Sequence, residues 1–164
     1  MNKPVWRAVL VALAGLAVLF SIARIRYSGT VSLRLPGDSC NAGLWKHVYE
    51  PERLRVLADC TAIEGGVVSL NRGSDGDLHI ALDPDDAAVL NLVNALHGQR
   101  HLVVEIICEH EAERDDIKAV CAGLAPSVPI PSVGERIRVT GSYVTDRDIG
   151  WNEVHPVTRI DKLQ

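Results

Sequence analysis

Five strand-like segments, a pair of glycines inside the first of them, and one short helical segment between the third and fourth predict a mainly β fold. In each strand-like segment apolar and β-branched residues alternate or run together, and turn residues separate one segment from the next. The resulting order is β-β-insert-β-α-β-β, which is typical of a five-stranded Greek-key barrel of the oligonucleotide/oligosaccharide-binding (OB) type. A hydrophobic N-terminal helix is predicted to precede this barrel.

The first two predicted strands form a hairpin. Residues 54–70 are typical of one long strand, and Gly65 and Gly66 within it would allow the bend that a barrel strand needs. A polar turn at 71–77 leads to residues 78–82, where leucine and isoleucine alternate with histidine and alanine.

An insert follows the second strand. Asp83 followed by Pro84 resembles a helix start, and Gly98 would end the helix, although a structured loop would use similar residues. The later elements are an apolar strand, a short helix with an Asp cap and a Gly stop, and two final strands. Their residue ranges are 101–108, 115–123, 136–146 and 151–161.

Residues 1–26 carry an export or anchoring signal. Thirteen apolar residues run without a break from Ala8 to Phe20, with basic residues on both sides. This length suits the core of a signal peptide, and the 19 residues 5–23 could span a bilayer if Arg7 snorkels. We favour an uncleaved membrane anchor over a cleaved signal, with a buried core helix as the third alternative. Residues 27–47 are then a connector, and 48–164 form the barrel domain.

The cysteines indicate the compartment. All four (Cys40, Cys60, Cys108 and Cys121) follow the apolar run, and none shows the paired spacing of a zinc site. An even number of cysteines after an export signal indicates two disulfides in an oxidising compartment. Three pairings are possible, and we favour Cys40–Cys60 with Cys108–Cys121 because each closes a short loop between neighbouring elements. The sequence therefore predicts that the barrel domain lies outside the cytoplasm, on the membrane or secreted.

The charge of the predicted barrel domain argues against polyanionic partners. Four of the 17 basic residues lie in 1–26, where there is no acidic residue, so the rest of the chain carries 13 basic against 21 acidic side chains. A body with a net charge of −8 does not attract nucleic acid or an anionic membrane surface electrostatically. Nucleic acid is therefore not an expected partner.

Several short motifs connect the chain with a known group of proteins. They are HVYEPERL at 47–54, DGDLH at 75–79, LVVE at 102–105, VTG at 139–141 and GWNEVHPV at 150–157, together with Cys60 and Cys108. With these motifs the chain resembles a family of small exported bacterial and archaeal domains that have no established activity. In that family a histidine usually precedes the Gly-Trp pair, where this chain has Ile149. The resemblance implies an exported OB-like domain and adds no chemistry.

A set of acidic and histidine side chains is the first candidate site. Strand alternation places Asp77 and His79 opposite the apolar residues of the second strand, and it places Glu153 and His155 together on the last strand. In an OB barrel the third strand lies between these two, so Glu105 could bridge the histidines if it points outward. Histidines with carboxylates suit a divalent transition metal. Hairpin-turn chemistry and a hydrogen-bonded polar cluster explain the same residues without a cofactor, and we expect the cluster.

Aromatic and basic residues on the last strands are the second candidate. Trp151 and Tyr143, next to Arg136 and Arg138, have the composition of a surface on which OB barrels stack bases or sugars. The acidic body and the low aromatic content, 4%, argue against such a surface. Packing at the core or rim is the simpler role for Trp151.

Two functions remain open after these exclusions. The chain has no Gly-x-Ser-x-Gly motif, no phosphate-binding glycine loop and no thiol expected to stay free. The leading prediction is therefore a non-enzymatic binding module, tethered to the membrane by its N-terminal helix, for an unknown ligand or protein. The alternative is a metal-dependent hydrolase in which Asp77, His79, Glu153 and His155 hold the ion and position a water.

Overall fold

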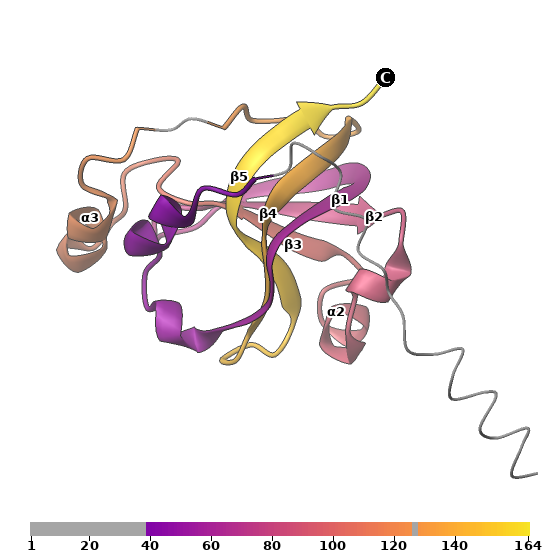
Figure 1. Ribbon diagram of the computed structural model, residues 1–164, viewed down its shortest axis with the longest axis horizontal. Coiled ribbons are helices and arrows are strands. Elements are labelled where there is room, and N and C mark those ends of the chain that lie inside the picture. The colour runs from indigo at the N-terminus through magenta and orange to yellow at the C-terminus, as the bar shows by residue number, and fades with distance from the viewer. Residues whose placement is uncertain (1–38, 126–127) are drawn as a thin grey trace, which may run out of the picture. The chain divides into compact units, whose positions relative to one another are not determined.

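The computed structural model describes residues 39–125 and 128–164, and it shows a mainly β protein (Figure 1). The strands are β1 (Leu54–Arg72), β2 (Leu78–Pro84), β3 (Leu102–Ile106), β4 (Arg136–Asp146) and β5 (Asn152–Lys162). The helices are α2 (Leu92–Leu96) and α3 (Asp115–Cys121), and single 3-10 turns lie at Ala42–His47, Pro51–Arg53 and Ala87–Val89.

The five strands close into a ring in the order β1-β2-β3-β5-β4, because β4 pairs again with β1. β3 and β5 run parallel, whereas the other neighbouring strands are antiparallel. α3 lies between β3 and β4 in the chain, where the sequence predicted a short helix. The mainly β prediction, with its five strands and this helix, is confirmed.

β1 belongs to two strand pairs at once. Its first part pairs with β4 and its last part with β2, and Gly65 and Gly66 pair with both neighbours. A Cβ atom at Gly65 would collide with the main-chain oxygen of Asp83 in β2, so a larger residue would push the two strands apart. The glycine pair therefore lets one long strand serve both sides of the ring.

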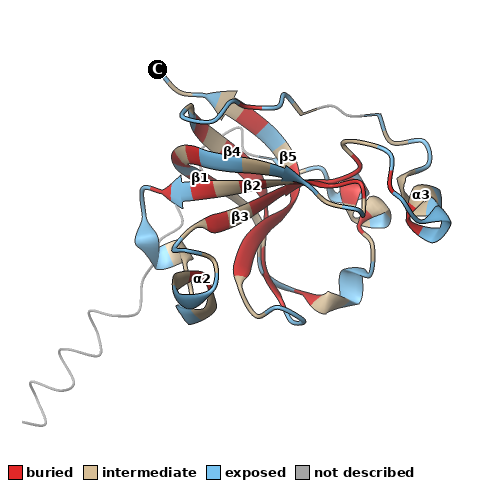
Figure 2. Ribbon diagram, turned by 180° about the vertical axis from the view of Figure 1, so that it is seen from behind, coloured by how far each residue is buried: buried red, intermediate tan, exposed pale blue. Residues whose placement is uncertain are grey.

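Two apolar clusters lie on opposite faces of the strands. The larger one fills the ring and consists of Ile63, Val67, Leu78, Ile80, Leu82, Leu102, Val104, Ile106, Ile137, Val139, Val154, Val157 and Ile160. The smaller one lies outside the ring and joins β4 to the segments before β1 and after β3; it consists of Leu44, Val48, Leu54, Ile107, Cys108 and Val144. Figure 2 shows buried residues along β3, β4 and β5, so these strands are covered on both faces.

The insert after β2 differs from the prediction. β2 continues to Pro84, and the helix predicted to start at Asp83 is replaced by the 3-10 turn Ala87–Val89 and by α2. Asn91 caps α2, since its side chain accepts hydrogen bonds from the amides of Val93 and Asn94 at 2.9 and 3.0 Å. Strand pairing with Gly65 holds Pro84 extended and so delays the helix.

The predicted anchor or signal segment 1–26, including its hydrophobic helix, lies outside the described residues. Within 39–125 and 128–164 there is no helix long and apolar enough to cross a membrane. Part of the predicted connector is described, and there the 3-10 turn Ala42–His47 buries Leu44 in the smaller apolar cluster. The packed region therefore begins before residue 48.

Candidate functional site

A row of three polar side chains crosses the outer face of β2, β3 and β5. His79 is paired with Glu105, and the parallel register of β3 with β5 places His155 beside Glu105. Their neighbours along each strand lie in the large cluster inside the ring, so alternation turns these three side chains outward. Asp77 directly precedes β2, and Glu153 lies two residues before His155 in β5. The structure thus brings together all five candidate ligands from the sequence.

This polar face is buried beneath the segments that flank it. Glu153 and His155 are 0% exposed, Glu105 is 3% exposed and Asp77 is 6% exposed. The residues directly after β3 belong to the smaller apolar cluster, as does Val144, which pairs with Glu153. The closed surroundings were not predicted, because an outward position on a strand normally faces water.

His155 is the centre of the hydrogen-bonded contacts. Its Nδ1 lies 3.1 Å from Oε1 of Glu153, with hydrogen-bond geometry, and 2.7 Å from Oε2 of Glu105. The indole N–H of Trp151 donates to the other Glu153 oxygen at 2.8 Å. Glu153 is therefore held from two sides, as a carboxylate with no access to water must be.

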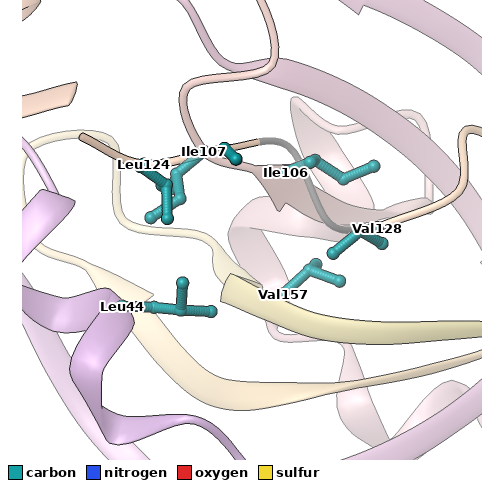
Figure 3. A pocket seen from close by; sticks show the side chains of 7 residues that line it. Leu44, Ile106, Ile107, Leu124, Val128 and Val157 are labelled. Carbon is teal, nitrogen blue, oxygen red and sulfur yellow. The ribbon is translucent and has the colours of Figure 1, made fainter. Parts of the chain in front are cut away.

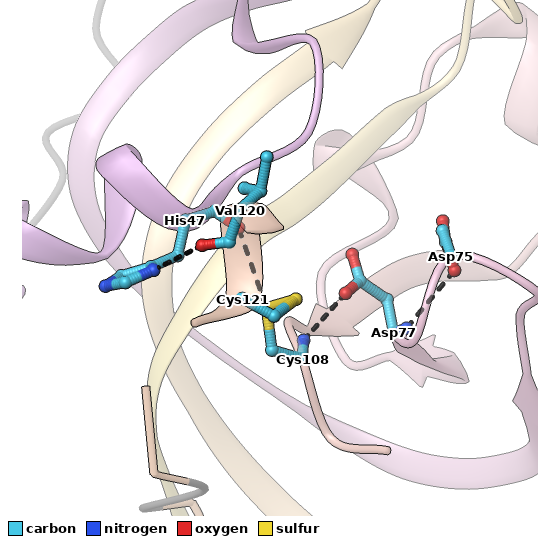
Figure 4. The surroundings of a disulfide bond; sticks show 6 residues. All are labelled: His47, Asp75, Asp77, Cys108, Val120 and Cys121. Carbon is cyan, nitrogen blue, oxygen red and sulfur yellow. Dashed lines mark hydrogen bonds between the residues drawn. A yellow bond between two sulfur atoms is a disulfide. The ribbon is translucent and has the colours of Figure 1, made fainter. Parts of the chain in front are cut away.

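Asp77 is fixed by the loop after β3. Its Oδ1 accepts a hydrogen bond from the amide of Cys108 at 2.7 Å, and Cys108 is in turn bonded to Cys121 (Figure 4). Gly76, directly before it, has a φ of 91°, and its carbonyl accepts the amide of His110 at 3.1 Å. The turn between β1 and β2 is thus docked onto this loop, which places Asp77 at the edge of the cluster.

Burial and charge shift the pKa values of the cluster in opposite directions. Burial alone lowers the pKa of His155, but the charges of Glu105 and Glu153 and the hydrogen bonds to them raise it to about 10. Burial alone raises the pKa of Glu105, whereas the charge of His155 lowers it to about 2. Burial raises the pKa of Asp77 to about 6 and also raises that of Glu153. At neutral pH His155 is therefore a positively charged imidazolium.

His79 marks the open end of the row. Its side chain is 33% exposed, and its Nε2 lies 3.8 Å from Glu105 Oε1 and 3.9 Å from Asp75 Oδ2. Both distances exceed those of hydrogen bonds. His79 therefore lies at the partly exposed end of the row, on the β2 side.

Two disulfides hold the covering segments, and both predicted pairings are confirmed. Cys40–Cys60 ties the start of the described chain to β1. Cys108–Cys121 ties the residues after β3 to α3, as Figure 4 shows. His47 adds a further link, since its Nδ1 lies 2.7 Å from the carbonyl oxygen of Val120 in α3.

The second candidate surface, around Trp151, is engaged by the protein itself. Trp151 is half-buried and donates to Glu153, while the hydroxyl of Tyr143 donates to the carbonyl of Val89. Arg136 forms an ion pair with Asp85, and Arg138 forms one with Glu64. These contacts occupy polar groups that a stacked base or sugar would need.

Sequence analysis missed the charged pair beside the cluster. Arg53 forms an ion pair with Asp146, whose side chain is 1% exposed, and the charge of Arg53 acts on Glu105 and Glu153. Arg53 lies in the 3-10 turn before β1 and Asp146 at the end of β4. Their separation of 93 residues leaves no local pattern that would pair them.

A buried amide pair was also missed. Asn94 of α2 is 0% exposed and exchanges hydrogen bonds with the main chain of Asn152 in β5, each at 2.9 Å. No local pattern pairs the two residues, because they lie 58 positions apart in the sequence. The pair fastens α2 to the start of β5.

An apolar hollow lies where residues of both apolar clusters meet the segment after α3 (Figure 3). Its lining residues carry no charged group: Leu44, Ile106, Ile107, Leu124, Ala125, Val128 and Val157. None of the candidate site residues lines it.

Comparisons with known proteins add no family to this description. No family model matches the chain, and neither a curated protein nor a solved structure matches it.

Proposed function

We propose that this chain is an exported, membrane-tethered domain of OB type that acts as a non-enzymatic binding module. The OB assignment is supported by the closed strand order, the parallel β3–β5 pair, the helix between β3 and β4, and a glycine-bent β1 shared by two neighbours. The predicted resemblance to small exported domains points in the same direction.

Export and tethering are supported by two independent features. The apolar run Ala8–Phe20 precedes every cysteine, and the cysteines are paired in two disulfides, which persist in oxidising compartments. A reporter that requires export, fused behind Gln164, should be active, and washing with high salt or carbonate should not release the chain from membranes. Activity of a cytoplasmic reporter in the same place would contradict the proposal.

The closed polar cluster carries the non-enzymatic part of the proposal. A hydrolase must bring substrate and water to its acidic and histidine groups, but Glu153 and His155 have no exposed surface. The hollow found near the smaller cluster is apolar and lacks the acid and base groups of a catalytic site. The geometry therefore favours a structural role for the cluster and leaves binding to the outer surface.

The surface that we assign to binding lies at the α2 end of the domain. Leu92 and Leu96, one helical turn apart, are 72% and 67% exposed, and Ile149 in the β4–β5 turn is 51% exposed. Asn91 donates to the carbonyl of Gly150 at 2.9 Å, so α2 and this turn lie together. Because the body is acidic, the matching partner is an apolar patch on another exported protein rather than an anionic bilayer.

Photo-crosslinking in the producing cell tests this surface. With p-benzoylphenylalanine in place of Leu96, we expect one discrete protein adduct that disappears when Leu92→Ser is added. The same probe in place of Val133, which is also exposed at 62%, is the control and should give no such adduct. Lipid adducts alone, or the same adduct from both positions, would rule out the assigned surface.

A further inference from the structure

The buried cluster contains more negative than positive groups. Asp77, Glu105 and Glu153 are three carboxylates of at most 6% exposure, and among the described residues His155 is the cationic group that contacts two of them. Arg53 lies nearby but is committed to Asp146. Uncompensated buried charge is costly, so the surplus must be neutralised by protons or by a cation.

The donor atoms of this cluster converge. One donor atom each from Asp77, Glu105 and His155 lies within 4.8 Å of the other two, and all three residues are buried. Oε2 of Glu105 faces Nδ1 of His155 at 2.7 Å, and Nε2 of His155 has no hydrogen-bond partner. A buried polar atom without a partner is rare, and this one lies in the group that could surround an ion.

The surroundings orient these donors in the way that metal sites require. Nδ1 of His155 contacts both Glu153 and Glu105, and Glu153 is itself held by Trp151, so the orientation of the ring is fixed and Nε2 is its nitrogen without a partner. The Cys108 amide holds one oxygen of Asp77 and leaves the other available. His79, the most exposed member of the row, has its Nε2 3.8 Å from Oε1 of Glu105.

We infer that Asp77, Glu105 and His155 bind one divalent transition-metal ion in a structural site. Two carboxylates with an imidazole suit Zn²⁺ or Mn²⁺. When the ion binds, His155 gives up a proton to become a neutral ligand, so a charge of +2 replaces a charge of +1 and the buried negative surplus falls from two to one. The ion would tie the β1–β2 turn, β3 and β5 together beneath the disulfide-bonded loop. Because the site is closed, the ion stabilises the fold and has no open position for a substrate.

Equilibrium dialysis of the full-length, oxidised chain after EDTA treatment tests the site with Zn²⁺ and Mn²⁺ as probes. We expect one equivalent of ion per chain of the wild type. Glu105→Gln should weaken binding about 100-fold or more. Glu153→Gln, which removes no ligand but changes the orientation of His155 and the buried charge, should weaken it about 10- to 100-fold. The matched control is Glu109→Gln, because Glu109 lies 3.2 Å from His110 in a histidine–carboxylate pair outside the cluster. This control should bind as the wild type does.

A measurement on the wild type keeps the inference testable if a variant does not fold. Addition of Zn²⁺ should shift the ring nitrogen resonances of His155 in NMR spectra and leave those of His110 in place. The inference is overturned if no ion binds stoichiometrically, if Glu105→Gln binds as tightly as Glu109→Gln, or if His110 responds instead of His155. None of these results depends on what the α2 surface binds.

Discussion

Removal of the Cys108–Cys121 disulfide is the sharpest test of how the covering segments are held. The bridge spans 13 residues of sequence, and the chain-entropy model then gives a loss of about 3 kcal/mol in the free energy of unfolding. We expect the double variant Cys108→Ala/Cys121→Ala to remain folded, because domains commonly have ~5–15 kcal/mol in total. Urea unfolding of the full-length chain, followed by far-UV circular dichroism, measures the loss.

The other disulfide supplies a matched control. Cys40–Cys60 spans 20 residues, so the same model predicts that Cys40→Ala/Cys60→Ala costs only about 0.4 kcal/mol more. The two variants should therefore lose similar amounts of unfolding free energy but loosen different parts of the structure. Hydrogen exchange should rise in α3 and around Cys108 in the first variant, and around the 3-10 turn Ala42–His47 in the second.

Two outcomes would refute this reasoning. A loss below about 1 kcal/mol would mean that the loop is already restricted in the unfolded chain or held by other contacts. Increased hydrogen exchange in β1 and β2, with α3 unchanged, would mean that the Cys108–Cys121 disulfide stabilises the strands of the ring and not the segments that cover the polar cluster.

Three further substitutions probe the ring and the buried charges, each read out by urea unfolding. Trp151→Phe removes the donor to the buried carboxylate of Glu153 and should cost about 1.5–3 kcal/mol. Trp45→Phe removes a hydrogen bond to a neutral hydroxyl and should cost about 0.5–1.5 kcal/mol. Equal losses would contradict the expectation that a hydrogen bond to a charged group is the stronger one. Gly65→Ala should cost about 1–3 kcal/mol because its Cβ collides with β2, while Gly66→Ala, whose Cβ meets no atom within 4 Å, should change stability by less than about 0.5 kcal/mol. Arg53→Met should cost about 3–5 kcal/mol by leaving a buried aspartate unpaired, and a loss under about 1 kcal/mol would show that backbone donors alone satisfy it.

The strands and the disulfides were predictable because their signals are local. Alternation along residues 78–82 encodes which side chains face the core, and the nearly continuous apolar run 101–108 predicts a buried strand; the observed ring uses both. Gly65 marked the point where β1 approaches β2 closely, because a side chain there would collide with the main chain of Asp83. The cysteine pairing followed from short loops, which carry the smallest closure cost.

The insert could not be predicted to the same degree. Asp83 and Pro84 form a good helix start in isolation, but pairing of Pro84 with Gly65 overrides that local preference. Asn91 is the actual cap of α2, and its side chain also bonds to Gly150 and Asn152. These partners are about 60 residues away in sequence, so no window along the chain contains the reason for the helix start.

The candidate site separates the two kinds of information in the same way. By itself, the sequence determined that Asp77 lies on the same face as His79 and that Glu153 lies on the same face as His155, because a period of two is a property of each strand alone. The strand pairing brings these residues and Glu105 onto one face of the sheet. Only the tertiary structure decided that this face is closed, since the segments that cover it come from before β1 and from after β3. On an open strand this polar row would be solvated. Burial turns it into a cluster whose charges must be neutralised by protons or ions. That burial depends on packing between distant parts of the chain.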